Sequence, residues 1–168
     1  MGGVTPEVAL AIQTQKQRYA RYADTKQWKK FEEEVLLPDG KFLFLDIDGT
    51  PLKVGTTVFQ WSSTKPFVQF FEGFFSKAHT LHNIAPGDFE QVKPDEVEAI
   101  FAMEDQILMD PFQSIAQIRG GGFYYETWKL VDGEWYIKNL RLERSYQKVS
   151  FLIHVANFLQ TWLGLPLL

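Results

Sequence analysis

The feature that most constrains the fold of this chain is a change in hydrophobic period part-way along it. Apolar residues recur at helical spacing over residues 6–23 and again over 28–35. A third helical pattern, rich in phenylalanine, starts near Ser63 or Thr64 with Pro66 in its first turn. From residue 78 onward the pattern becomes strand-like. We expect these strands near 78–85, 89–93, 97–109, 115–131 and 134–147. Helices followed by long antiparallel strands are typical of an α+β domain.

Turn signals divide these segments. Asp132-Gly133 stands between two alternating aromatic runs, which predicts a tight β-hairpin. Pro38-Asp39-Gly40 predicts a turn before a strand over residues 41–48, and Asp48 is expected to initiate the turn that follows. Asp24 follows the first helical pattern, and we expect its carboxylate to cap the second helix. Three consecutive glycines, residues 120–122, predict a bulge or sharp bend that curls the sheet.

The end of the chain becomes helical again. Apolar residues at helical spacing run from Val149 to Leu163, and Gly164 and Pro166 are expected to end this helix. A length of 168 residues fits one domain. We therefore expect one domain over residues 1–148 and an apolar helical extension over 149–168.

Composition narrows the class of function. The net charge of −4 and the lack of a basic face argue against a nucleic-acid partner. The chain has no cysteine, which excludes disulfides and thiolate chemistry. Neither a signal peptide nor a membrane-length apolar run is apparent, so we expect a cytoplasmic protein. The 15% aromatic content predicts a thick core or an aromatic-lined cavity.

Asp105 is the most informative polar residue. Strand alternation over residues 97–109 places it on the more apolar face, in line with Phe101, while Glu104 takes the other face. A carboxylate on an apolar face must be paired, hydrogen-bonded or protonated, and its pKa is then open to tuning for proton transfer. The alternative is a buried aspartate satisfied by backbone amides, or one that lies at a solvated end of the strand.

Two histidines lie close together, at His79 and His82, and in a strand they point to opposite faces. Only one of them can therefore enter a cavity, where it would serve as a general acid or base. The alternative is one hydrogen-bonded core histidine and one solvated histidine. No third ligand is signalled nearby, so no metal site is expected.

Other polar residues could complete a pocket. Asp46 shares a strand face with two phenylalanines, and Tyr124 and Tyr125 point to opposite faces, so that one could donate a hydrogen bond to a substrate oxygen. Arg144 is in phase with two leucines and could pair with a buried carboxylate or an anionic substrate, or equally extend to solvent at the sheet edge. We add Trp28 to the expected aromatic wall.

The order of several segments resembles that of SnoaL-like proteins of the NTF2-like superfamily. Residues 19–28 with 38–40 resemble the opening helices of these proteins and of scytalone dehydratase, although Ala23 stands where that enzyme has a tyrosine. Residues 79–83 resemble the family's His-x-x-x-Asn strand, and residues 99–105 a strand that ends in the aspartate of the bile-acid dehydratase type. Residues 120–128 with 132–144 resemble the closing hairpin.

The resemblance implies a cone-shaped α+β barrel, with N-terminal helices packed on a strongly curved, mostly antiparallel sheet, and often a homodimer. It also implies catalysis without a cofactor by His, Asp and Tyr. Carried over, His79 takes the place of the family histidine, Asp105 that of its aspartate, Asp24 that of the scytalone dehydratase aspartate, and Arg144 that of the bile-acid enzyme arginine. A four-residue segment, 85–88, is longer than the family's usual turn, so His82 stays an equal candidate for the histidine.

The sequence thus predicts an isomerase, cyclase or dehydratase that acts on a hydrophobic polycyclic molecule, such as a terpenoid, polyketide or steroid of secondary metabolism. Asp105 and one histidine would form its base–acid pair. The main alternative is a non-catalytic module that binds hydrophobic ligands or dimerises, in which Asp105 is paired with Arg144 or capped by the backbone and phenylalanines fill the cavity. An epoxide hydrolase with Asp24, Asp46 and Asp105 around one water is a weaker alternative.

Overall fold

The computed structural model describes residues 2–163 and has the α+β architecture expected from the sequence. Its helices are α1 (Pro6–Asp24), α2 (Trp28–Val35), α3 (Thr64–Phe74) and α4 (Phe151–Leu163). Its strands are β1 (Gly2–Gly3), β2 (Leu36–Leu45), β3 (Lys53–Val54), β4 (Thr57–Val58), β5 (Gln60–Trp61), β6 (Ala78–Ile84), β7 (Asp88–Lys93), β8 (Glu96–Met109), β9 (Gln117–Val131) and β10 (Glu134–Val149).

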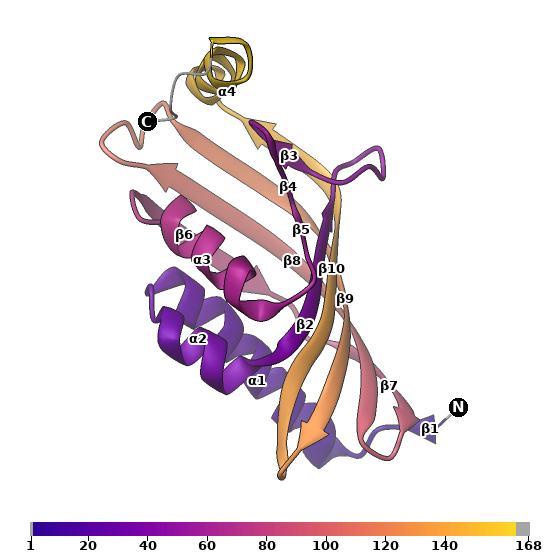
Figure 1. The fold of residues 1–168 in the computed structure, drawn as a ribbon. Coiled ribbons are helices and arrows are strands. Elements are labelled where there is room, and N and C mark those ends of the chain that lie inside the picture. Colours follow the sequence, from indigo (N-terminus) through magenta and orange to yellow (C-terminus); the bar gives the residue numbers. More distant parts are fainter. Residues whose placement is uncertain (1, 164–168) are drawn as a thin grey trace.

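The main sheet is open and strongly curved, and α1, α2 and α3 gather on one of its faces (Figure 1). Its strands follow the order β1-β7-β8-β9-β10-β2-β5, and β6 pairs with the second half of β8. All pairs are antiparallel except β10 with β2. The curved sheet and the three helices therefore enclose a single core.

The long strands lie where the alternating pattern predicts them. The hairpin between β9 and β10 turns at Asp132 (φ 50°) and Gly133 (φ 88°), the left-handed pair that an Asp-Gly turn favours. Alternation along β8 buries Phe101 and Asp105 and exposes Glu104, as expected. The α3 helix begins after Ser63 with Pro66 in its first turn, also as expected.

The glycine triplet lies opposite a bulge. Residues Arg144 and Tyr146 of β10 pair with Gly122 and Gly121, so Ser145 is the extra residue. A Cβ atom added at Gly120 would lie 2.5 Å from Arg144 Nη1 and 3.2 Å from Asp105 Oδ1. The triplet therefore leaves room for a charged pair that crosses the inner face of β9.

Two local predictions were wrong. Pro38-Asp39-Gly40 does not precede β2 but lies inside it, where the pairing shifts register and four residues of β2 (37–40) lie opposite the single Lys138 of β10. Asp24 does not cap α2, whose N-cap is Gln27 without a side-chain hydrogen bond. Asp24 is instead the last residue of α1, and its carboxylate accepts hydrogen bonds from β6.

The predicted C-terminal helix is present as α4, which stands at the end of β10 apart from the other helices (Figure 1). Its expected stop at Gly164 and Pro166 lies outside the described residues. Within residues 2–163, no helix is both long and apolar enough to cross a membrane.

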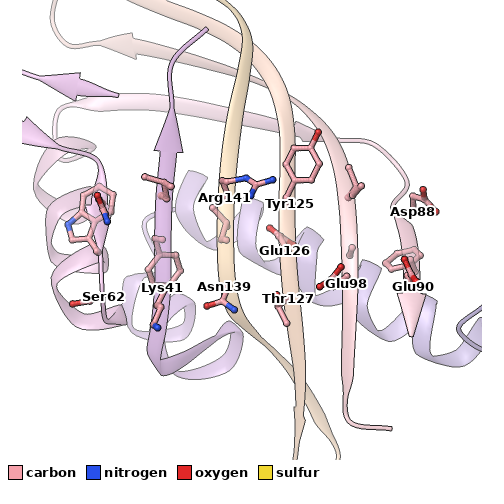
Figure 2. Close-up of a pocket in the computed structure, with 18 of the residues that line it drawn as sticks. Lys41, Ser62, Asp88, Glu90, Glu98, Tyr125, Glu126, Thr127, Asn139 and Arg141 are labelled. Atoms are coloured by element: carbon pink, nitrogen blue, oxygen red, sulfur yellow. The ribbon is translucent and has the colours of Figure 1, made fainter. Parts of the chain in front are cut away.

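The outer face of the sheet carries charges of opposite sign on its two sides (Figure 2). Lys41 of β2 and Arg141 of β10 lie on one side. Glu98 of β8 and Asp88 and Glu90 of β7 lie on the other.

Candidate active site

A histidine–aspartate pair joins the first helix to the sheet. His82 Nδ1 lies 2.7 Å from Asp24 Oδ1, and the His82 backbone N–H donates to Asp24 Oδ2 at 2.9 Å. The Thr80 hydroxyl also donates to Asp24 Oδ1, at 2.8 Å. Thr80 and His82 share a face of β6 because side chains alternate along a strand, and Asp24 reaches both from the end of α1.

The charge of Asp24 fixes the role of each ring nitrogen. Partial burial raises the pKa of Asp24, but its hydrogen bonds with His82 and Thr80 lower it more, and its pKa lies below the ordinary value. An ionised carboxylate can only accept hydrogen bonds, so His82 Nδ1 carries the proton. The lone pair is then on Nε2, which Asp24 does not engage and which can accept a proton in the cavity.

Asp105 and Arg144 form a second buried pair. Arg144 Nη1 lies 3.0 Å from Asp105 Oδ1 and Nη2 lies 2.6 Å from Oδ2, a bidentate arrangement. Their side chains are only 4% and 7% exposed. Burial lowers the pKa of Arg144, but the Asp105 carboxylate raises it more, so the guanidinium stays charged. Both Asp105 oxygens are thus engaged, and Asp105 is a partner for a cation rather than a free base.

The two pairs are neighbours. His82 and Asp105 are directly paired across β6 and β8, which places their side chains on the same face at roughly 5 Å between Cβ atoms. Both residues and Arg144 line one cavity. Among the described residues, Arg144 Nε is buried and has no hydrogen-bond partner, so the wall offers one unused N–H donor.

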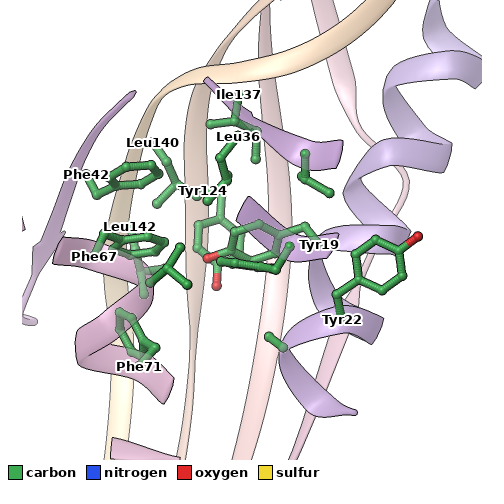
Figure 3. Close-up of a cluster of buried hydrophobic side chains, with 14 of the residues drawn as sticks. Tyr19, Tyr22, Leu36, Phe42, Phe67, Phe71, Tyr124, Ile137, Leu140 and Leu142 are labelled. Atoms are coloured by element: carbon green, nitrogen blue, oxygen red, sulfur yellow. The ribbon is translucent and has the colours of Figure 1, made fainter. Parts of the chain in front are cut away.

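Two tyrosines complete the polar wall, and they lie side by side near the middle of the cluster in Figure 3. The rings of Tyr19 and Tyr124 are 5.9 Å apart in an edge-to-face contact. Burial raises the pKa of both phenols, so both hydroxyls stay protonated and can donate.

A buried lysine lies against these two rings. Lys16 Nζ is 3.6 Å from the ring centroid of Tyr124 and 4.0 Å from that of Tyr19, and it is ion-paired with Glu126. Trp128 Nε1 donates to the other Glu126 oxygen at 3.0 Å. Burial lowers the pKa of Lys16 and raises that of Glu126, although each partner opposes the shift of the other.

Sequence reasoning missed Tyr19 and Lys16. Both could have been found from the helical spacing of Ile12, Lys16 and Tyr19, which places them on the apolar face of α1. A lysine on such a face indicates a buried ion-pair partner.

The remaining wall is apolar apart from Gln147, and aromatic rings make up much of it. It includes Trp28, Phe44, Phe59, Phe71 and Phe75, and the enclosed space is about 60 Å³. Ligand pockets for small molecules usually measure roughly 300–1,000 Å³. Aromatic side chains therefore fill most of the volume, and a ligand has to displace some of them.

Other expected site residues lie away from this cavity. His79 points outward with 66% of its side chain exposed and lies 3.1 Å from Asp110. Tyr125 is on the outer sheet face under the Arg141 guanidinium. Asp46 accepts a hydrogen bond from the Ile47 backbone beside the turn. Phe101 is buried against Phe89 in the core.

Of the predicted residues, the structure thus brings Asp24, His82, Asp105, Tyr124 and Arg144 together, and Trp28 lies in the aromatic wall. Within residues 2–163, no three His, Asp or Glu side chains are grouped so that they could hold a metal ion.

Comparison with known proteins identifies the family. A model of the SnoaL-like domain matches residues 6–141. The chain belongs to the SnoaL-like family of the NTF2-like superfamily. It is 40% identical to a protein named probable cyclase FGR4 of Gibberella zeae, over 146 residues that make up 87% of this chain and 97% of the relative.

Three solved structures have a similar fold to this SnoaL-like protein but share little sequence with it. A Kribbella flavida protein, Kfla4162, has a TM-score of 0.72 at 16% identity, covering 86% of this chain and 95% of the other. A Novosphingobium aromaticivorans protein provisionally named a scytalone dehydratase has a TM-score of 0.70 at 15% identity, covering 83% and 85%. Hexachlorocyclohexane dehydrochlorinase LinA-type3 of Novosphingobium barchaimii has a TM-score of 0.66 at 14% identity, covering 84% and 89%. These matches show the fold alone.

Proposed function

We propose that this SnoaL-like protein is a cofactor-independent acid–base enzyme, an isomerase, cyclase or dehydratase. The observation that carries the proposal is the His82–Asp24 pair on the wall of an apolar cavity, beside a buried arginine with an unused N–H. The name of the 40% identical relative, a cyclase, agrees with this class of reaction. The dehydratase and dehydrochlorinase names among its structural neighbours point to proton removal as well.

In this proposal each polar group has a distinct role. His82 Nε2 removes a proton from a carbon next to a carbonyl group, and the electron pair of the broken C–H bond moves onto the carbonyl oxygen. Asp24 holds the ring and stabilises the imidazolium that forms. Arg144 Nε and the Tyr124 and Tyr19 hydroxyls are the donors for the developing oxyanion. In an isomerisation the C=O bond re-forms and the imidazolium returns the proton to another carbon of the conjugated system. In a dehydration the C=O bond re-forms, a C=C bond forms as the C–O bond of a β-hydroxyl breaks, and the imidazolium protonates the leaving oxygen to give water. In a cyclisation the enolate carbon attacks a second carbonyl carbon of the same molecule, and the imidazolium protonates the resulting alkoxide.

Asp105 has a different role from the one its sequence position suggests. Since both of its oxygens accept from Arg144, it orients the guanidinium and does not exchange protons with substrate. The pair expected between Asp105 and a histidine is replaced in this proposal by the pair between Asp24 and His82.

The composition of the cavity wall favours a hydrophobic substrate. Aromatic rings surround the polar groups on the side of α3, and they offer flat apolar surface and no further charge. A polycyclic terpenoid, polyketide or steroid with one ketone or hydroxyl group would match this wall.

We also propose that the protein works as a homodimer through the outer face of its sheet. Under a two-fold axis, the basic side with Lys41 and Arg141 would face the acidic side with Glu98, Glu90 and Asp88 of the second copy. Sedimentation at low and high salt tests this, because a dimer held in part by these charges weakens as salt rises.

A non-catalytic carrier is the second candidate, and the closed Asp105–Arg144 pair and the filled cavity are what favour it. Deuterium wash-in separates the two. The protein is incubated in D₂O with a panel of polycyclic ketones, and mass spectrometry follows deuterium entry next to the carbonyl. An enzyme catalyses exchange in the wild type and in His79→Gln, but not in His82→Gln. The same ketones are also tested for binding by the rise in thermal midpoint that they cause. Binding of ketones without deuterium exchange in any of them would favour the carrier.

A further inference from the structure

The second residue after α1, Lys26, has a backbone conformation that disfavours a side chain. Lys26 has φ 59°, in the left-handed region. Its N–H donates to Ala23 O, and the N–H of Gln27 donates to Tyr22 O at 2.8 Å. This is the Schellman motif, in which the left-handed position is usually glycine. A lysine there carries a steric cost that glycine would avoid, so its side chain needs a compensating role.

The ammonium group of Lys26 makes specific contacts beside the histidine pair. Lys26 Nζ donates to Thr80 Oγ1 at 2.9 Å and lies 4.8 Å from the ring centroid of Phe75. The Phe75 ring in turn lies 6.2 Å from the His82 ring. Burial lowers the pKa of Lys26, and the Asp24 carboxylate opposes this shift. The lysine is thus folded over the cavity wall rather than extended into solvent.

These contacts determine which group donates in each hydrogen bond of the series that links Lys26, Thr80, Asp24 and His82. An ammonium group only donates, so Thr80 Oγ1 accepts from Lys26 and must direct its own hydrogen elsewhere. That hydrogen goes to Asp24 Oδ1, the oxygen that also accepts from His82 Nδ1. The order is Lys26 to Thr80 to Asp24, with His82 donating from the other side.

We propose that Lys26 and Thr80 are positioning residues that hold Asp24 ionised and His82 in its Nδ1–H form. Neither residue reaches the substrate; both act through Asp24. The value of this arrangement for catalysis rests on the proposed function, in which His82 Nε2 is the base, but its effect on the histidine can be measured without a substrate.

A favourable helix-dipole interaction is the simpler explanation for a lysine at this place. It does not account for the inward contact, because an extended lysine would interact with the helix end as well, and Arg21 already lies in the last turn of α1. The dipole explanation also predicts that the Thr80 hydroxyl is unimportant.

The test is ¹⁵N NMR of the histidine rings, which reports directly which nitrogen carries the proton. The protein has three histidines, and the variants His79→Gln and His154→Gln assign the signals. Thr80→Val removes the hydroxyl while keeping the shape and strand preference, and Thr80→Ser restores it. Lys26→Gly removes the ammonium and suits the left-handed backbone. Lys29→Ala, at an exposed site on α2, is the control for the same change in net charge.

We expect the wild type, Thr80→Ser and Lys29→Ala to show the Nδ1–H form of His82. In Thr80→Val the share of the Nε2–H form should rise about fivefold, the change expected when one hydrogen bond of ordinary net strength is lost. Lys26→Gly should shift the ratio in the same direction while its thermal midpoint stays equal or rises. An unchanged ratio in both Thr80→Val and Lys26→Gly would overturn the inference.

The same data separate this inference from the proposed function. If the ratio does not respond but His82→Gln still abolishes deuterium exchange, only the positioning role fails. If the wild-type His82 already carries its proton on Nε2, then its role as base fails and the positioning role fails with it. Should Thr80→Val not fold, Lys26→Gly against Lys29→Ala decides.

Discussion

Replacing Arg144 with methionine should destabilise the protein strongly. The Asp105 carboxylate is 4% exposed, and both of its oxygens accept hydrogen bonds only from this guanidinium among the described contacts. Without Arg144 a buried charge is left unpaired, which costs about 3–5 kcal/mol in comparable buried pairs. For a domain of this size that corresponds to a fall in Tm of roughly 6–20 °C.

The assay is urea unfolding at pH 7, with a matched double variant. Arg144→Met together with Asp105→Leu removes both charges, and should recover most of the loss because replacing both partners of a buried pair by apolar groups is often neutral. Arg119→Met is the control, since Arg119 is exposed and its guanidinium hydrogen-bonds only to the Gln117 side chain among the described contacts. We expect a change of about 0–1 kcal/mol for this control.

Two results would refute the reasoning. A loss below about 1 kcal/mol for Arg144→Met would mean that Asp105 is solvated in the absence of ligand. A double variant as unstable as the single one would mean that Arg144 contributes through packing of its stem and not through the charge of Asp105.

Three further predictions concern neighbouring groups. Asp24→Asn should be less stable than the wild type at neutral pH. The difference should be lost as the pH falls below 3.8, because the pKa of Asp24 is lowered in the folded state. Gly120→Ala should cost about 1–3 kcal/mol in urea unfolding, since its Cβ would lie 2.5 Å from Arg144 Nη1, whereas Gly73→Ala meets no atom within 4 Å. Lys16→Met should cost about 3–5 kcal/mol, and adding Glu126→Leu should restore most of this.

The sheet could be predicted from sequence because strand alternation is a local signal. Residues 97–109 alternate so regularly that the buried position of Asp105 follows directly. Asp132-Gly133 likewise marks the hairpin between β9 and β10 without any tertiary information. The short strands β3, β4 and β5 could not be found in this way, because two residues carry no period.

The partners of the site residues were harder to predict. Arg144 was expected to pair with a buried carboxylate, to bind an anion or to lie at the sheet edge, and its two hydrogen bonds to Asp105 show which of these holds. The absence of a side chain at Gly120 leaves room for this pair, which is a tertiary feature that the spacing of Arg144 does not encode. From its place after the first helix, Asp24 was expected to cap the second helix, whereas the resemblance to scytalone dehydratase placed it among the catalytic residues. Its contact with His82 joins positions 58 residues apart, and no local pattern encodes that distance.

The two walls of the cavity differ in how firmly they are held, and this bears on how a filled cavity can still be a site. Each charged group of the polar wall is fixed by directional bonds between separate elements, as between α1 and β6 for Asp24 or between β8 and β10 for Asp105. The opposite wall is held by ring contacts, such as that of Phe71 with Phe59 at 5.9 Å, which have no comparable directional demand. A ligand can therefore enter by displacing rings while the polar groups keep their geometry. Under the proposed function, the chemistry would depend on groups of the sheet and α1, and the shape of the accepted molecule would depend on α3 and the short strands beside it.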